Sequence, residues 1–186
     1  MKLVYKRQHL MFKYPSSVPP DGPSFAWTEI DESIINNYFA KHKKAFLSFL
    51  NQGAFGIALI DEEGWQAYGW LARPGQPFPP HFPSWIYRDS QYWIFYCRTH
   101  ENHRSQGLYK AVLTRLVNEA LVERASPDIY IDTSPDNIAA RKAITRTGFV
   151  PAGITQTLNI VVPKLTTLHF GNWSKDSAHS APEVQT

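Results

Sequence analysis

Short apolar runs and amphipathic segments alternate along the chain, and together they predict a mixture of strands and helices. The densest run, residues 92–97, is aromatic and β-branched with polar residues on both sides, which is typical of a buried strand. After it, apolar side chains recur every three or four positions, as on one face of a helix, at Leu108, Val112, Leu113, Leu116, Val117, Ala120 and Leu121. The pattern therefore predicts a strand that passes through residues 104–107 into a long helix.

The remaining segments alternate between the same two kinds of pattern. Apolar spacing followed by Gly53 predicts a helix over residues 31–51. An Asp-Glu-Glu-Gly turn between two apolar runs predicts a hairpin of strands 54–60 and 65–72. A second helix is expected to begin at Ser134-Pro135, with the serine as its N-cap, and to stop at Gly148. Further strands are expected at residues 2–13, 129–132, 154–162 and 165–170.

The turn at residues 104–107 has the chemistry of an anion site. A helix N-terminus presents unpaired backbone N–H groups, and its partial positive charge favours a phosphate. Gly107 lets the backbone approach a ligand closely, and Arg104 and Lys110 add formal positive charge. The sequence therefore predicts a phosphate-binding turn.

Two sequence blocks, at residues 104–109 and 137–149, together resemble the GCN5-related N-acetyltransferase (GNAT) superfamily. Residues 104–109, Arg-Ser-Gln-Gly-Leu-Tyr, are similar to its acyl-CoA-binding signature Arg/Gln-x-x-Gly-x-Gly/Ala, with Tyr109 where Gly or Ala is usual. Residues 137–149 are similar to a second element that begins Asn-x-x-Ala and ends Gly-Phe. The resemblance covers roughly residues 45–165 and implies an α+β fold, with a mixed, mostly antiparallel sheet of about six to seven strands and helices on both faces.

The resemblance also implies a cosubstrate, acetyl-CoA. Backbone amides of the turn would bind its pyrophosphate, strand residues before the turn would pair with its pantetheine arm, and an asparagine at the second block would make a further hydrogen bond. The cofactor-binding residues implied in this way are Cys97, Thr99, Arg104, Ser105, Gln106, Gly107, Leu108, Tyr109 and Asn137.

The expected proton donor is missing. The position that is often tyrosine in the family falls on Ile144, which cannot donate a proton. Candidates to protonate the departing thiolate are Tyr109, Ser134 and Tyr96, and candidates to deprotonate the amine are Glu101 and His100.

Several of these residues have an alternative, purely structural interpretation. Asn137 is also typical of a first helical turn, and Cys97 of an inert buried thiol. Cys97, His100 and His103 are too few for a zinc site, so we expect no metal. Asp89 and Asp132 are candidates to hold a cationic amine, although each is also typical of a turn or strand end. Further candidates, for a platform that holds the acceptor, are Trp65, Trp70, Trp85 and Trp93. Tryptophans at strand spacing are more often core residues, and Trp85 in the proline-rich loop is the best exposed candidate.

Composition bounds the class of protein. A chain of 186 residues with 43% hydrophobic content predicts one globular domain, expected over residues 1–171 with a disordered tail at 172–186. One cysteine and the lack of a long apolar run predict a cytoplasmic protein without a membrane segment. The net charge of +3 comes from scattered residues, which disfavours nucleic-acid binding.

Together these expectations predict an N-acetyltransferase that moves an acetyl group from acetyl-CoA to a primary amine of a small molecule, peptide or protein. The alternative is a catalytically weak or inactive acyl-CoA-binding sensor or interaction module of the same fold, which the isoleucine at position 144 favours. Because pairing through the C-terminal strands is common in the family, a homodimer is a further expectation.

Overall fold

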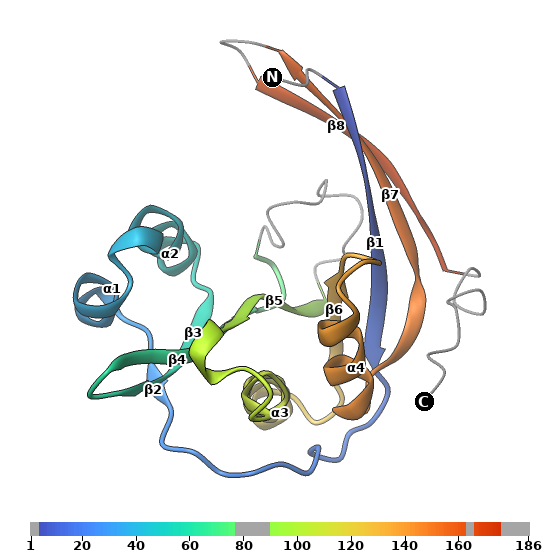
Figure 1. The fold of residues 1–186 in the computed structure, drawn as a ribbon. Coiled ribbons are helices and arrows are strands. Elements are labelled where there is room, and N and C mark those ends of the chain that lie inside the picture. Colours follow the sequence, from blue (N-terminus) through green and yellow to red (C-terminus); the bar gives the residue numbers. More distant parts are fainter. Residues whose placement is uncertain (1–3, 77–89, 163–165, 176–186) are drawn as a thin grey trace.

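The computed structural model describes residues 4–76, 90–162 and 166–175. They form one eight-stranded sheet in the order β2-β3-β4-β5-β6-β1-β7-β8, so the expected mixed α+β fold is confirmed with more strands than the six or seven predicted (Figure 1). Its elements in chain order are β1 (Val4–Tyr14), β2 (Thr28–Glu29), α1 (Glu32–Tyr38), η1 (Ala40–His42), α2 (Lys43–Asn51), β3 (Phe55–Asp61), β4 (Gly64–Ala72), β5 (Gln91–Thr99), η3 (Glu101–His103), α3 (Leu108–Glu123), β6 (Asp128–Thr133), α4 (Ile138–Arg146), β7 (Val150–Val162) and β8 (Thr166–Ser174).

Helices cover both faces of the sheet, as predicted. On one face, Phe46 and Phe49 of α2 pack edge-on against Trp70 of β4. On the other, the apolar stripe of α3 is buried against the sheet together with Ile144 of α4. We call these the α1–α2 face and the α3–α4 face. Each face has its own apolar core, so the sheet separates two groups of buried apolar side chains.

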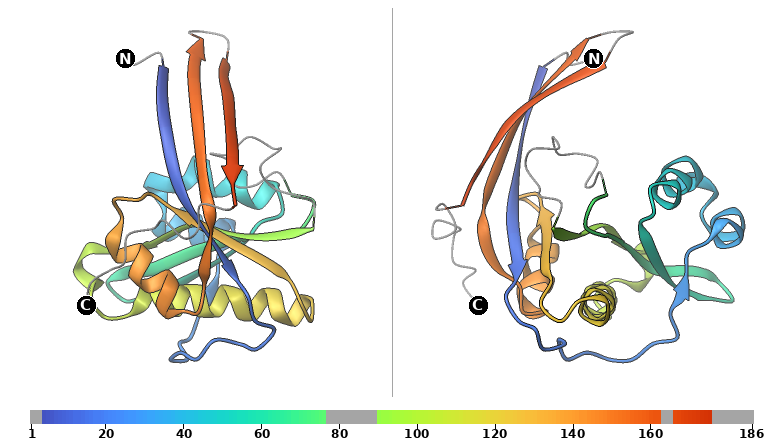
Figure 2. Two further views of the ribbon diagram at one scale, coloured as in Figure 1. Left: turned by 90° about the vertical axis from the view of Figure 1, so that its right-hand side faces the viewer. Right: turned by 180° about the vertical axis from the view of Figure 1, so that it is seen from behind.

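The first strand lies in the middle of the sheet. β1 runs antiparallel to both its neighbours, β6 and β7, and Leu10 is opposite Thr133 on one side and Ile154 on the other. β1, β7 and β8 extend together beyond the rest of the molecule as a three-stranded arm (Figure 2). The N-terminal segment therefore contributes side chains to the centre of the sheet, which the sequence pattern did not predict.

Two helix boundaries differ from the prediction. The helix expected over residues 31–51 is broken at Phe39, where φ is −124° and ψ is 35°, because the Phe39 ring turns into the core against Phe46 and Tyr68. The helix expected to start at Ser134 is capped instead by Asn137, whose Oδ1 accepts the Ala140 N–H at 3.1 Å.

The C-terminal expectation was also partly wrong. Strand β8 continues to Ser174, so residues 172–174, predicted as part of a disordered tail, pair with β7. Residues 176–186 lie outside the described residues. Residues 77–89 of the proline-rich loop, which include Trp85 and Asp89, also lie outside them. No helix among the described residues is long and apolar enough to cross a membrane.

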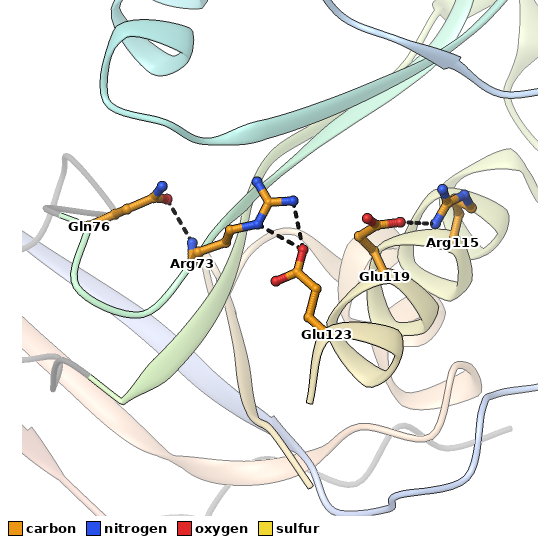
Figure 3. Close-up of polar contacts among 5 residues, drawn as sticks. All are labelled: Arg73, Gln76, Arg115, Glu119 and Glu123. Atoms are coloured by element: carbon orange, nitrogen blue, oxygen red, sulfur yellow. Dashed lines mark hydrogen bonds and ion pairs between the residues drawn. The ribbon is translucent and has the colours of Figure 1, made fainter. Parts of the chain in front are cut away.

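An ion pair holds the end of β4 to α3 (Figure 3). The guanidinium of Arg73 contacts Oε1 of Glu123 through Nη2 at 2.6 Å and through Nε at 2.8 Å. The Gln76 side chain accepts the Arg73 backbone N–H at 2.7 Å, and Arg115 pairs with Glu119 one turn earlier on α3. The hydrogen bond that Arg73 donates to Glu123 raises the pKa of Arg73, and this contact holds the last turn of α3 against the end of β4.

Candidate active site

The two parallel strands of the sheet separate at their C-terminal ends. β5 and β6 are paired from Gln91↔Asp128 to Ile94↔Ile131, and their register continues no further. Beyond this point β5 keeps only β4 as a partner and β6 keeps only β1. Backbone groups of β5 that point towards β6 are therefore released from the ladder, and they are available to a ligand. We call this place the β5–β6 split.

A β-bulge lies on β5 directly after the split. Tyr68 is opposite Arg98 and Trp70 is opposite Phe95, so Gly69 alone faces two residues, Tyr96 and Cys97. Tyr96 has a φ of 51°, which is rare for a residue with a Cβ. The bulge redirects the Tyr96 ring towards α2, where it meets Phe46 and Phe49, and it leaves the ring 46% exposed.

The predicted phosphate-binding turn lies between η3 and α3. Ser105 and Gly107 both have positive φ, 64° and 77°, and residues 104–107 are all exposed. Gly107 is the N-cap of α3, and no described side chain caps the helix there. The first N–H groups of α3 are thus left for water or an anion, which is the arrangement that the sequence predicted.

Three expected site residues lie on the α3–α4 face next to the split. Cys97 packs under α3, and burial raises the pKa of its thiol to about 12, which supports the interpretation as an inert thiol. Burial also raises the pKa of Tyr109 well above its usual value, and Cys97 and Asp132 both contribute to this increase. Thr99 ends β5 with a buried Oγ1 that has no hydrogen-bond partner among the described residues.

The other candidates are placed around the same strand ends. Glu101, two residues after the end of β5, and Ser134, directly after β6, are both exposed. His100 stacks edge-on against Trp65 and accepts the Asn102 N–H through Nδ1 at 3.4 Å. Ile144 is fully buried in the α3–α4 core, so its position cannot exchange protons with a substrate. Among the described residues, no three His, Cys, Asp or Glu side chains converge on a metal site.

Two tryptophans of the suggested acceptor platform are core residues. Trp70 and Trp93 are almost completely buried on the α1–α2 face, while Trp65 is partly buried there.

A histidine and an aspartate that no sequence signal connected also meet near the split. His9 Nδ1 lies 2.7 Å from Asp132 Oδ2, although 123 positions separate the two residues. The Trp93 indole N–H donates to the other carboxylate oxygen, Oδ1, at 3.3 Å. Their contact could have been predicted only by knowing that β1 pairs with β6.

The family model described as Acetyltransferase (GNAT) family matches residues 18–149 of this chain. The chain belongs to the GNAT acetyltransferase family. The match covers both sequence blocks, the β5–β6 split and the turn before α3. It begins after β1 and ends directly before β7, so all three strands of the arm lie outside it.

Solved structures show the same fold. A GNAT family protein from Novosphingobium aromaticivorans has a TM-score of 0.62 at 10% identity, over 83% of this chain and 64% of that one. An acetyltransferase of the GNAT family from Colwellia psychrerythraea has a TM-score of 0.59 at 14% identity, over 83% and 55%. A Drosophila protein has a TM-score of 0.61 at 10% identity, over 87% and 53%. This chain thus spans between half and two thirds of these structures, and no curated protein matches its sequence.

The GNAT signature departs from its usual form at Tyr109, and the structure shows where that side chain goes. Its ring packs against the α3–α4 core rather than over the exposed turn, because the helix begins one residue earlier. The larger residue therefore leaves the predicted phosphate-binding turn open, and its phenol lies close enough to Cys97 and Asp132 for both to add to the burial that raises the pKa of Tyr109.

Proposed function

We propose that this GNAT protein transfers an acetyl group from acetyl-CoA to a primary amine. The β5–β6 split carries the proposal, because it joins released backbone groups of β5 to an uncapped helix start on α3. When bound, acetyl-CoA supplies an acetyl group activated as a thioester.

The residues at the split fit such a cosubstrate. The turn at residues 104–107, with the N–H groups that begin α3, would hold the pyrophosphate. The orphaned Thr99 hydroxyl and the unpaired side of β5 offer polar partners to the amides of an extended arm. Asn137 already caps α4 through Oδ1, so its Nδ2 is the atom left for a cofactor contact.

Tyr109 is the proposed partner of the departing thiolate. Its raised pKa keeps the phenol protonated at neutral pH, so it can donate a hydrogen bond as negative charge develops on sulfur. Glu101 stays a candidate to deprotonate the amine, and Ser134 stays a second candidate to protonate the thiolate; both are exposed near strand ends.

A pocket of about 360 Å³ beside α3 is suited to the anionic end of the cosubstrate. Lys110 from the first turn of α3 and Arg146 from the last turn of α4 both line it, together with Asp21. Since Lys110 is three residues after Gly107, the pocket adjoins the proposed pyrophosphate site. A second pocket, of about 580 Å³, lies on the three-stranded arm and has no part in this proposal.

The test combines binding and turnover. Calorimetric titration with acetyl-CoA and a thermal-shift scan should show micromolar binding and a raised melting temperature, because a ligand of the folded state stabilises it. The release of free thiol from acetyl-CoA is then measured with four amine acceptors: lysine, a peptide with a free N-terminus, spermidine and glucosamine. Absence of binding by acetyl-CoA would contradict the proposal.

The second candidate function is an acyl-CoA-binding module without efficient catalysis. The observation in its favour is Ile144, which is fully buried where the family often has its tyrosine. This candidate predicts acetyl-CoA binding together with no thiol release above background for any acceptor.

A further inference from the structure

Arg98 lies on β5 beyond the split, on the face of the sheet opposite α3. β5 pairs with β6 only as far as Ile94. Arg98 is directly opposite Tyr68 of β4, and Tyr68 belongs to the core of the α1–α2 face. Because directly opposite side chains lie on the same face of a sheet, the Arg98 guanidinium is on the α1–α2 face. Burial raises the pKa of Tyr68 and the charge of Arg98 opposes this increase, which agrees with a guanidinium beside the hydroxyl.

The neighbours of Arg98 on this face form a cluster of rings. The buried Tyr68 ring stacks with that of Tyr96, with 6.4 Å between their centroids. His42, at the end of η1, lies 5.8 Å from the Tyr68 ring and 6.2 Å from the Tyr96 ring. Tyr96 is 46% exposed, and Arg98 is exposed as well. An open aromatic ring and an open guanidinium therefore occupy the same face directly after the split.

The charge at this cluster is positive. Burial lowers the pKa of His42, and the charges of Arg98 and Lys41 lower it further. His42 is therefore largely neutral at pH 7, and the guanidinium carries the charge. Arg73 and Arg115 are each paired with a glutamate of α3, whereas Arg98 forms no ion pair with any carboxylate of the described residues. The guanidinium is thus available to an anionic group.

The acceptor of the proposed reaction has to come from this side. The cosubstrate would occupy the α3 side of the split, so the α1–α2 side is the one left open to an amine. A guanidinium binds a carboxylate through two parallel, charge-assisted hydrogen bonds. The Tyr96 ring beside it offers apolar surface to the rest of such a molecule.

We propose that the acceptor is an amine that also carries a carboxylate, such as an α-amino acid, and that Arg98 binds this carboxylate. The inference rests on the proposed acetyltransferase function and assigns the chemical class of its second substrate. Arg98 is then a specificity-determining residue. It holds the amine in place for attack on the thioester and takes no part in proton transfer.

The experiment compares acceptors that differ only in the carboxylate. The pairs are phenylalanine with phenethylamine, leucine with isoamylamine, and lysine with cadaverine. For each amine, kcat/KM is obtained from the release of free thiol from acetyl-CoA. The wild type should be faster with at least one amino acid than with its decarboxylated partner.

Arg98→Gln should lower kcat/KM for that amino acid about 10- to 100-fold, mainly through a higher KM, because a charge-assisted contact with the substrate is lost. The decarboxylated partner should be acetylated as fast as by the wild type. Comparing variant with wild type on one acceptor removes the effect of the different amine pKa values. Arg98→Lys keeps the charge but not the planar fork, so it should retain part of the preference.

Arg124→Gln is the matched control. Arg124 is an exposed arginine directly after α3, at the end of the helix away from the phosphate-binding turn. This variant loses the same charge and should keep the wild-type preference. Acetyl-CoA affinity measured by calorimetry shows that each variant is folded and binds its cosubstrate.

Each result decides between the two proposals. If Arg98→Gln lowers kcat/KM equally for both members of the preferred pair, Arg98 does not bind the carboxylate, while acetyl transfer stands. A wild type that acetylates amines without favouring the carboxylate form in any pair also overturns the inference alone. An equal loss in Arg124→Gln would assign the preference to overall charge and overturn it too. A wild type without turnover on any amine overturns the proposed function and the inference together.

Discussion

Gly69 and Cys97 face each other at the bulge between β4 and β5. A Cβ on Gly69 would lie 2.8 Å from Cys97 Sγ and 2.5 Å from Val112 Cγ1 of α3. Both distances are shorter than ordinary van der Waals contacts, so the glycine allows α3 to sit directly on the sheet. This close approach sets the position of the helix start relative to the split.

The first prediction concerns this contact. Gly69→Ala should lower the free energy of unfolding by about 1–3 kcal/mol, because α3 and the bulge must move apart. Gly69→Ala should cost less free energy of unfolding in a Val112→Ala background than in the wild type, because the shorter side chain at position 112 removes the nearer of these two clashes. Urea denaturation of both single variants and the double variant measures the coupling. Strictly additive losses would contradict the proposed clash.

The second prediction isolates the phosphate-binding turn. Gly107→Val should lose acetyl-CoA binding while the protein stays folded. Gly75→Val is its control, because Gly75 has nearly the same backbone, with φ of 84° against 77°, and a Cβ at either position meets no atom of the described residues within 4 Å. Both variants should be destabilised by about 1–2 kcal/mol by the left-handed conformation. If calorimetry shows equal acetyl-CoA affinity in both, Gly107 is not part of the site.

The third prediction concerns Tyr109. Tyr109→Phe should lower kcat about 100-fold with little change in acetyl-CoA affinity, because only the hydroxyl is removed. The phenol has a raised pKa and stays protonated through the neutral range, so its removal should lower kcat equally at pH 6 and pH 9. Steady-state kinetics at both pH values test this. Full turnover in the variant would exclude Tyr109 as the proton donor.

Local patterns in the sequence were sufficient for most elements and for the turn. The aromatic run became β5, the spaced leucines and valines became α3, and the turn predicted between them ends at Gly107, the N-cap of α3. Each of these depends on neighbours within a few positions. The hairpin predicted from strands 54–60 and 65–72 also depends only on near neighbours, and the antiparallel pairing of β3 with β4 confirms it.

Long-range pairing was not readable from the same patterns. Alternation in residues 2–13 predicts a strand but not that β6 and β7 will flank it, so the contact of His9 with Asp132 could not be foreseen. The bulge at Tyr96 depends on the register with β4, and the break at Phe39 on a ring that packs in the core. In each of these cases tertiary contacts decide what local propensity leaves open.

The fourth prediction tests the ion pair of Arg73 with Glu123. Because the two side chains are 34% and 25% exposed, breaking it by Glu123→Gln should cost only about 0.5–1 kcal/mol. Arg115→Gln is the control, since the pair of Arg115 with Glu119 is equally short but lies within α3. A double-mutant cycle of Arg73→Ala and Glu123→Gln gives the coupling energy. A coupling of zero would show that the pair does not hold α3 to β4.

The last prediction uses the single cysteine. Burial raises the pKa of the Cys97 thiol from 9.0 to about 12, so its thiolate fraction near pH 8 falls about 1000-fold. Native protein should react with iodoacetamide about 1000-fold more slowly than urea-unfolded protein. The same pKa increase means that folding favours the neutral thiol. Its stabilising contribution is therefore complete below pH 9 and is lost as the pH rises towards 12. Cys97→Ala should show a shallower loss of stability over that range than the wild type. Fast labelling of the native protein, with the same slope in both proteins, would mean that Cys97 is open to solvent and that α3 does not seal this side of the split.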